Sequence, residues 1–94
     1  MSAAPQVTRE GDALVFRGVL DRDAVAAVWT QARPLLAGIH RLDLNAVPAI
    51  DSAGLALLAE LAGDVPGATI EGAPTGYTEL RAAYRLDPAL GFAG

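Results

Sequence analysis

The sequence predicts an α/β domain in which helices pack on a small mixed sheet of about four strands. Segments rich in β-forming residues alternate along the chain with segments whose apolar residues recur at helical spacing. Clusters of Gly, Pro and Asp separate these segments, as turns do. The 94 residues, 52% hydrophobic and 19% charged, are enough for one core and too few for two domains.

The first strand is expected to follow an N-terminal tail. We assign residues 1–10 to a flexible tail and residues 11–94 to a single domain. Gly11 and Asp12 form a turn signal. Residues 13–20 are rich in β-formers and predict one strand or two short ones, with a bulge or tight turn at Gly18.

The first helix is expected to begin at Asp21 or Asp23, because either carboxylate can accept hydrogen bonds from the free amides of a first turn. Pro34 lacks an amide proton and should kink this helix or end it near Arg33, and Gly38 ends it in either case. The stripe that should face the core consists of Val25, Val28, Trp29, Ala32 and Leu36.

The next segments repeat the order of strand and helix. Residues 40–45 alternate polar with apolar side chains, which predicts a strand that Pro48 cannot extend. A second helix is expected over residues 52–62, and a short strand over residues 68–71. Thr75 or Thr78 should then cap a third helix. The apolar residues of that helix and of the tail after it are Tyr77, Leu80, Tyr84, Leu86, Leu90 and Phe92.

Charge and composition indicate the class of partner and the compartment. The net charge is −4, and the seven cations are all Arg, spread singly along the chain. Nucleic acids and anionic membranes need clustered cations, so we expect a protein partner. The N-terminus lacks the features of a signal peptide, and the apolar run of residues 53–59 is far shorter than the roughly 20 residues that span a bilayer. These features predict a soluble, cytoplasmic protein without membrane insertion.

Several kinds of catalysis need residues that this chain lacks. It has no Lys for a Walker-type phosphate loop or a Schiff base, and no Cys for a thiolate nucleophile. Ser52 has Gly54 after it but Ile50 before it, which is half of a nucleophile elbow. The single histidine, His40, precedes a strand and is expected to face solvent, so a hydrolase using Ser52 and His40 is the least favoured hypothesis.

The acidic residues are expected to cap helices and to lie in solvent. Pairs such as Asp21 with Asp23, or Asp43 with Asp51, could share a proton or bind a metal. A metal site usually has more than one histidine or a denser carboxylate cluster. We therefore predict a protein that is not an enzyme and that has no metal and no cofactor.

The start of the second helix is the candidate functional site. Asp51 and Ser52 are both good caps, but only one can occupy the N-cap position. If Asp51 caps the helix, the Ser52 hydroxyl is left free at the first helical position. A free hydroxyl there could be phosphorylated, opposed by the charge of Asp51, or could bond to a partner. The alternative is that Ser52 only caps the helix.

The body of this helix predicts a surface that contacts a partner. Its core stripe is expected to comprise Leu55, Leu58, Ala59 and Ala62, while Ala53, Leu57 and Leu61 place apolar atoms on other faces. Full burial of a helix is hard to arrange in so small a domain. We therefore expect a contact surface around Ser52, Ala56 and Leu57. Gly54 indicates close approach either of a partner or of the domain's own strand.

These residues carry a resemblance to a known family. Residues 42–44 (Leu-Asp-Leu), 47–50 (Val-Pro-Ala-Ile) and 51–55 (Asp-Ser-Ala-Gly-Leu) resemble the same region of STAS domains. Family members carry Asp-Ser or Asp-Thr there, followed by a small residue, Gly and Leu. The resemblance implies the fold shared by anti-sigma-factor antagonists and the cytoplasmic parts of some anion transporters.

Within the STAS family, the chain is most similar to the small subunits of phospholipid-transporting ABC systems. Residues 18–21, Trp29 and residues 54–58 carry this likeness. It implies a non-catalytic cytoplasmic subunit, peripheral to the inner membrane, that supports outer-membrane lipid asymmetry. Its implied partner is the transporter's ATPase, in a complex with a permease and a substrate-binding subunit.

The same resemblance implies roles for individual residues. Ser52 matches the hydroxyl residue that contacts the ATPase in these subunits and is phosphorylated in sigma-factor antagonists. Asp51, Ala53, Gly54 and Leu55 match the rest of the motif. The alternative function is therefore an anti-sigma-factor antagonist that binds a kinase and is switched by phosphorylation of Ser52.

Overall fold

The sheet has four strands whose order in space is their order in the chain. The structure, a computed structural model, describes residues 5–86 and residue 90. The strands are β1 (Gln6–Glu10), β2 (Ala13–Arg17), β3 (Arg41–Ala46) and β4 (Thr69–Glu71). Strands β1 and β2 are antiparallel, and β2, β3 and β4 are parallel. The predicted α/β class, with a mixed sheet of about four strands, is confirmed.

The expected tail is wrong for residues 6–10, which form strand β1. Val7 is the one buried side chain of this strand, so the alternation that signals a strand is missing from the sequence. The strand forms because Gly11, at a φ of 63°, turns the chain back along β2 and pairs Val7 with Phe16.

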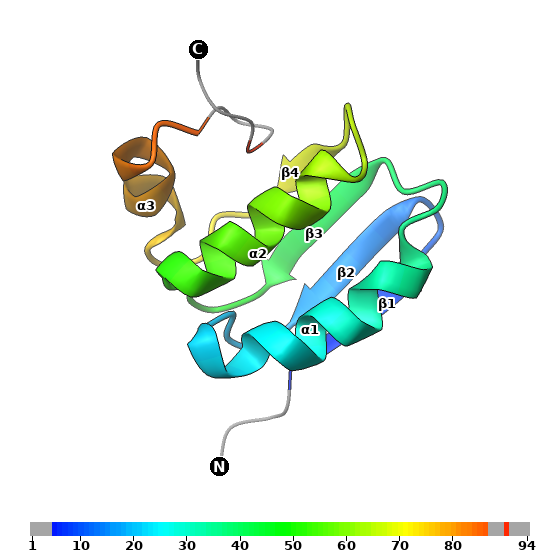
Figure 1. Cartoon of the computed structure of the whole chain (residues 1–94), viewed down its shortest axis with the longest axis horizontal. Coiled ribbons are helices and arrows are strands. Elements are labelled where there is room, and N and C mark those ends of the chain that lie inside the picture. The colour runs from blue at the N-terminus through cyan, green and yellow to red at the C-terminus, as the bar shows by residue number, and fades with distance from the viewer. Residues whose placement is uncertain (1–4, 87–89, 91–94) are drawn as a thin grey trace.

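Two helices lie side by side across one face of the sheet (Figure 1). Asp21 caps a short 3-10 turn, η1 (Arg22–Ala24), which leads into α1 (Val25–Ala32). Helix α1 ends one residue before Arg33, and Pro34 lies in a second 3-10 turn, η2 (Arg33–Leu35), as its missing amide predicts. Helix α2 (Ser52–Gly63) crosses the sheet beside α1.

The core fills the space between the sheet and these helices. Phe16 and Leu14 of β2 and Leu42 and Leu44 of β3 point to the helical side and are essentially inaccessible to solvent. Burying each such side chain contributes roughly 1.5–3 kcal/mol. The helices contribute Val28, Ala32, Leu55, Leu57, Leu58 and Leu61.

Helix α3 (Tyr77–Ala83) lies beyond α2, at the edge of the molecule (Figure 1). Neither Thr75 nor Thr78 caps it, so that expectation is wrong. Its N-cap is Gly76, whose φ of 90° lets the chain turn sharply into the helix without a side-chain cap. Of the apolar residues expected there, Tyr77 is buried and Tyr84 is exposed, while Phe92 lies outside the described residues.

The opposite face of the sheet is polar. Arg41 of β3 forms ion pairs with Asp12 and Glu71, and Arg17 of β2 pairs with Glu10. None of the helices in the described part of the chain is long and apolar enough to cross a membrane.

Candidate functional site

Two loops meet at the start of helix α2. Because β2 and β3 are parallel, the segments that leave them reach the same edge of the sheet. There Leu20 bridges Ile50: the Leu20 amide donates to the Ala49 carbonyl (3.1 Å), and the Asp51 amide donates to the Leu20 carbonyl (3.1 Å). This pairing fixes the backbone at Asp51 before the helix begins.

Asp51 is the N-cap of α2, so Ser52 is not. Its Oδ1 accepts a hydrogen bond from the Gly54 amide (2.9 Å), and its Oδ2 accepts one from the Arg22 amide (3.0 Å). The hydrogen bond from Gly54 is the main cause that lowers the pKa of the Asp51 carboxyl, burial opposes it, and the bond from Arg22 adds to it. Asp51 therefore carries a negative charge at neutral pH, beside Ser52.

The Ser52 hydroxyl is exposed at the first helical position. Within the described residues it makes no hydrogen bond, because Asp51 has taken the capping role. An exposed residue follows at each turn, with Ala56 and Glu60 at i+4 and i+8. Ser52, Ala56 and Glu60 form what we call the α2 ridge, and the half-buried Ala53 flanks it. The atoms presented along most of this ridge are small and uncharged.

The expectation that Leu57 faces a partner is wrong, because Leu57 is only 5% exposed. Leu55 and Leu61 are also buried, since α2 packs against η1, α1 and α3 as well as on the sheet. Gly54 packs on the domain's own backbone, where a Cβ would overlap the Leu20 carbonyl. Of the candidate residues, Asp51, Ser52, Ala53 and Ala56 thus reach the surface, and Gly54, Leu55 and Leu57 serve the core.

An apolar groove of about 720 Å³ runs beside the α2 ridge. One wall is α2, and the other is formed by Tyr84, Leu86 and Leu90, beyond helix α3. Sequence reasoning missed this groove, although the apolar residues after the third helix were its signal. The α2 residues that line it are Ser52, Ala53, Leu55, Ala56, Ala59, Glu60, Ala62 and Gly63, with Asp64 at the helix end.

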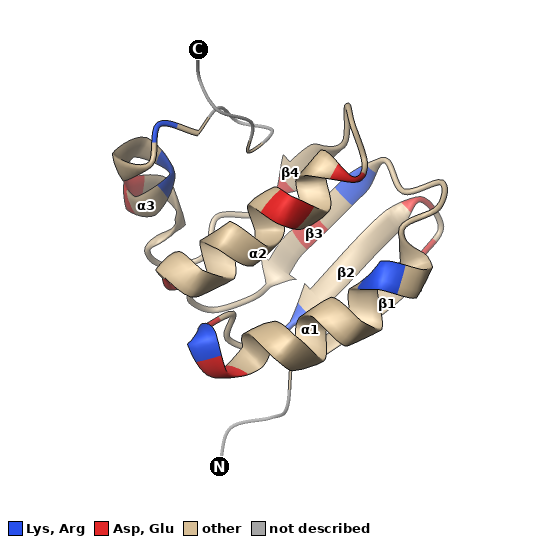
Figure 2. Ribbon diagram, viewed as in Figure 1, with Lys and Arg blue, Asp and Glu red and all other residues tan. Residues whose placement is uncertain are grey.

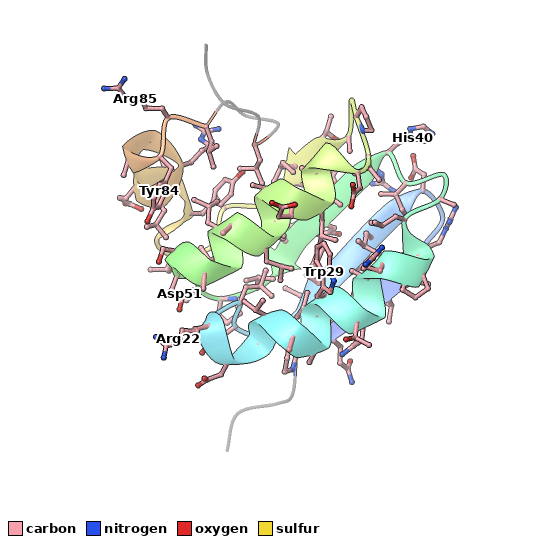
Figure 3. The ribbon with its side chains drawn as sticks, in the orientation of Figure 1. Arg22, Trp29, His40, Asp51, Tyr84 and Arg85 are labelled. Atoms are coloured by element: carbon pink, nitrogen blue, oxygen red, sulfur yellow. The ribbon has the colours of Figure 1, made fainter. Side chains whose placement is uncertain are left out.

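A smaller, polar hollow lies on the other side of the α2 start. It is lined by Asp21, Arg22, Asp23 and Asp51, and Figure 3 shows Arg22 and Asp51 next to each other there. Asp21 uses its carboxylate to cap η1, accepting from the Ala24 amide at 3.1 Å. Among the described residues, no three His, Asp or Glu side chains gather as metal ligands.

The residues of the hypothetical hydrolase are far apart. His40 lies just before β3, and Asp51 and Ser52 lie after it, so the length of the strand separates them. Figure 3 shows His40 and Asp51 at opposite ends of the molecule. The described structure therefore forms no Ser52–His40 pair.

Comparison with known proteins identifies the family. The family profile described as "Mlab, STAS domain" matches residues 3–91. The chain belongs to the STAS domain family. The fold agrees: the solved structure of the anti-sigma factor antagonist SpoIIAA in its unphosphorylated form superposes with a TM-score of 0.60, at 17% identity, over 97% of this chain and 90% of that one.

Within the family, the chain is most similar to MlaB proteins. It is 36% identical over 61 residues to the intermembrane phospholipid transport system binding protein MlaB of Escherichia coli (strain K12), a match that covers 65% of this chain. The protein of the same name from Shigella flexneri matches with the same identity and coverage. The matched segment spans 63% of the length of these relatives.

Proposed function

We propose that the protein is a non-catalytic accessory subunit of a phospholipid-transporting ABC system. It binds the transporter's ATPase, an MlaF-like protein, in a complex with an MlaE-like permease and an MlaD-like substrate-binding subunit. It resides in the cytoplasm, peripheral to the inner membrane, and the complex maintains outer-membrane lipid asymmetry. The name of the MlaB relatives supports this role, as does the resemblance of residues 51–55 to the motif of STAS domains.

The exposed hydroxyl of Ser52, which makes no hydrogen bond to any of the described residues, carries the proposal. A partner can bond to it without first breaking a bond within the domain, so little is lost on docking. Helix α1 contains no charged residue and α2 contains only Glu60, so the two ribbons are almost entirely tan in Figure 2. Because this helical surface carries almost no charge, a partner protein can cover it without removing water from many charged groups.

The accessory role follows from binding alone. A subunit that binds the folded ATPase but not its unfolded form stabilises the folded one by mass action, by about 2.7 kcal/mol when its free concentration is 100 times the Kd. A subunit that also favours the conformation in which the ATPase assembles with the permease raises transport without touching a reacting atom.

A phosphorylation-switched antagonist is the second candidate. The likeness of fold to SpoIIAA and the accessibility of Ser52 favour it. A phosphate on Ser52 would gain from the positive end of α2, but the ionised Asp51 carboxylate next to it would oppose the added charge. The greater sequence identity to MlaB proteins favours the transporter role.

Co-purification with the cognate ATPase tests the proposal. We expect the tagged protein to retain the ATPase and Ser52→Arg to lose it, because a long cation at the ridge prevents close docking. Circular dichroism should show that Ser52→Arg is as folded as the wild type, since position 52 is exposed. A wild-type protein that retains no ATPase, and that cells phosphorylate stoichiometrically at Ser52, would support the antagonist instead.

A further inference from the structure

The acidic residues at the end of helix α2 are unfavourable for the helix itself. Glu60 lies in the last turn, Asp64 is the C-cap, and no basic residue lies in that turn. The C-terminus of a helix carries a partial negative charge of about half a unit and favours cations. Both side chains are exposed, and both line the apolar groove. The groove therefore combines apolar walls with an end that is negative through two carboxylates and the helix dipole.

The wall opposite α2 adds an exposed aromatic residue. Tyr84 is 53% exposed, one of the most exposed large apolar side chains in the described part of the chain. Tyrosine is among the residues that most often contribute the largest share of binding energy at protein interfaces. The groove, Tyr84 and the α2 ridge are continuous, because Ser52, Ala56 and Glu60 line the groove as well.

We infer that this groove receives an amphipathic helix of the ATPase whose apolar face packs between α2 and Tyr84 and whose Lys or Arg residues lie against Glu60 and Asp64. The inference rests on the proposed function and specifies which kind of segment the ATPase supplies. An amphipathic helix places apolar residues at i, i+3, i+4 and i+7 on the face that enters an apolar groove, and charged residues on its other face. The small side chains of Ala53, Ala56 and Ala59 allow a helix to approach α2 closely.

The charge of the groove favours a cationic helix over two other possible occupants, a phospholipid and a second copy of this chain. A phospholipid would bring an anionic phosphate to Glu60 and Asp64, which repel it. A second copy of this chain carries a net charge of −4, and its cations are scattered arginines. A cationic helix is attracted by both carboxylates and by the end of α2, and it relieves the unfavourable placement of the two acids.

Charge reversal with a matched control tests the inference. Affinity for the purified cognate ATPase is measured for Glu60→Lys, Asp64→Lys and Glu79→Lys, with the melting temperature of each variant. We expect Glu60→Lys and Asp64→Lys each to weaken binding by about tenfold or more and to melt no lower than the wild type, because a cation suits the end of a helix. Glu79 is exposed, lies in the first turn of α3 and does not line the groove, so Glu79→Lys should bind within about twofold of the wild type.

A second measurement locates the contact. On titration of the isotope-labelled protein with the ATPase, we expect the largest amide shifts at Ala59, Ala62, Gly63 and Leu86 as well as at Ser52. Full affinity of both α2 charge variants, with Ser52→Arg still unable to bind, would overturn the groove inference and leave the proposed function in place. Failure of the wild type to bind the ATPase would overturn both. If the ATPase shifts none of these groove signals but dilution does, the groove binds a second copy of the chain. If only short-chain phosphatidylglycerol shifts them, the groove binds lipid.

Discussion

The carboxylate of Asp51 accepts a hydrogen bond from the backbone amide of Arg22, 29 residues earlier in the chain. The same carboxylate caps α2 through the Gly54 amide. One side chain therefore satisfies the first amides of two helical segments and holds η1 and α2 in fixed relation. The exposed Ser52 hydroxyl owes its position to this arrangement, because a residue that caps a helix cannot also offer its side chain to a partner.

Removal of the Asp51 side chain should destabilise the domain more than removal of an ordinary cap. Loss of an N-cap costs roughly 0.5–2 kcal/mol, and Asp51→Ala also leaves the Arg22 amide without its acceptor. We expect a loss in the upper part of that range from urea denaturation. Ser52→Ala serves as the control and should fall within about 0.5 kcal/mol of the wild type. Equal losses for the two variants would show that both residues share the cap.

The contribution of Asp51 should depend on pH. Its pKa in the folded protein is lowered from the ordinary value of 3.8, chiefly by the Gly54 amide. The unfolded chain therefore binds a proton at a higher pH than the folded chain, and stability falls as the pH falls between these two pKa values. Asp51→Asn does not titrate there and offers only one acceptor oxygen. The stability advantage of the wild type over Asp51→Asn should be fully present at neutral pH and should shrink as the pH falls below about 4. Urea denaturation at a series of pH values measures it, and an advantage that grew on acidification would contradict the assignment.

Two glycines of α2 should respond in opposite ways to alanine. At Gly54, a Cβ would overlap the backbone of Leu20, whose amide and carbonyl are both engaged in hydrogen bonds. Gly54→Ala should therefore destabilise by roughly 1–3 kcal/mol, in spite of the greater helix propensity of alanine. At Gly63, the added Cβ would meet no described atom within 4 Å beyond the adjacent residues and the nearby backbone of the helix, so Gly63→Ala should be neutral or stabilising by up to about 1 kcal/mol. Thermal unfolding of the two variants compares these effects directly.

The buried hydroxyl of Tyr77 should destabilise the folded domain. Its oxygen is buried and has no hydrogen-bond partner in the described part of the protein, and burial raises the pKa of the phenol. A buried polar group without a partner costs about 1–3 kcal/mol. Tyr77→Phe keeps the ring and should leave the domain as stable as the wild type or more so. A loss of more than about 1 kcal/mol in urea denaturation would reveal a bond that the hydroxyl makes in solution.

The elements with the strongest periodicity could be predicted from the sequence. The positions of β2, α1, β3 and α2 followed from apolar spacing, from the helix starts at Asp21 or Asp23 and at Asp51 or Ser52, and from Pro34. Strand β1 could not be predicted, because a strand held mainly by its pairing with β2 needs few apolar residues. The cap of α3 could not be predicted from Thr75 or Thr78, because Gly76 starts the helix through its backbone conformation and not through a capping side chain.

The sequence predicted where the candidate site lies but only some of the residues that form its surface. The motif at Asp51 and Ser52 located the start of α2 but left open which of the two residues caps it, and the structure shows that Asp51 does. The prediction that Leu57 faces outward was wrong, because α2 does not pack only on the sheet: α1 and α3 cover its flanks. Periodicity along one helix does not report how many neighbours that helix has. The groove with Tyr84 and Leu86 depends on contacts between elements distant in the chain.

The order of the strands has a consequence for how the protein is made. Every strand pairs with the strand before or after it in the chain, from β1 to β4. A tight turn at Gly11 and Asp12 joins β1 to β2, and a segment with a helix joins each parallel pair, so no pairing needs a strand from a distant part of the chain. As the chain leaves the ribosome, each new strand can add to a sheet edge that is already present. The residues that hold Ser52 in position lie between Leu20 and Gly54, so we expect the start of α2 to be fixed before Tyr84 and Leu86 add the second wall of the groove.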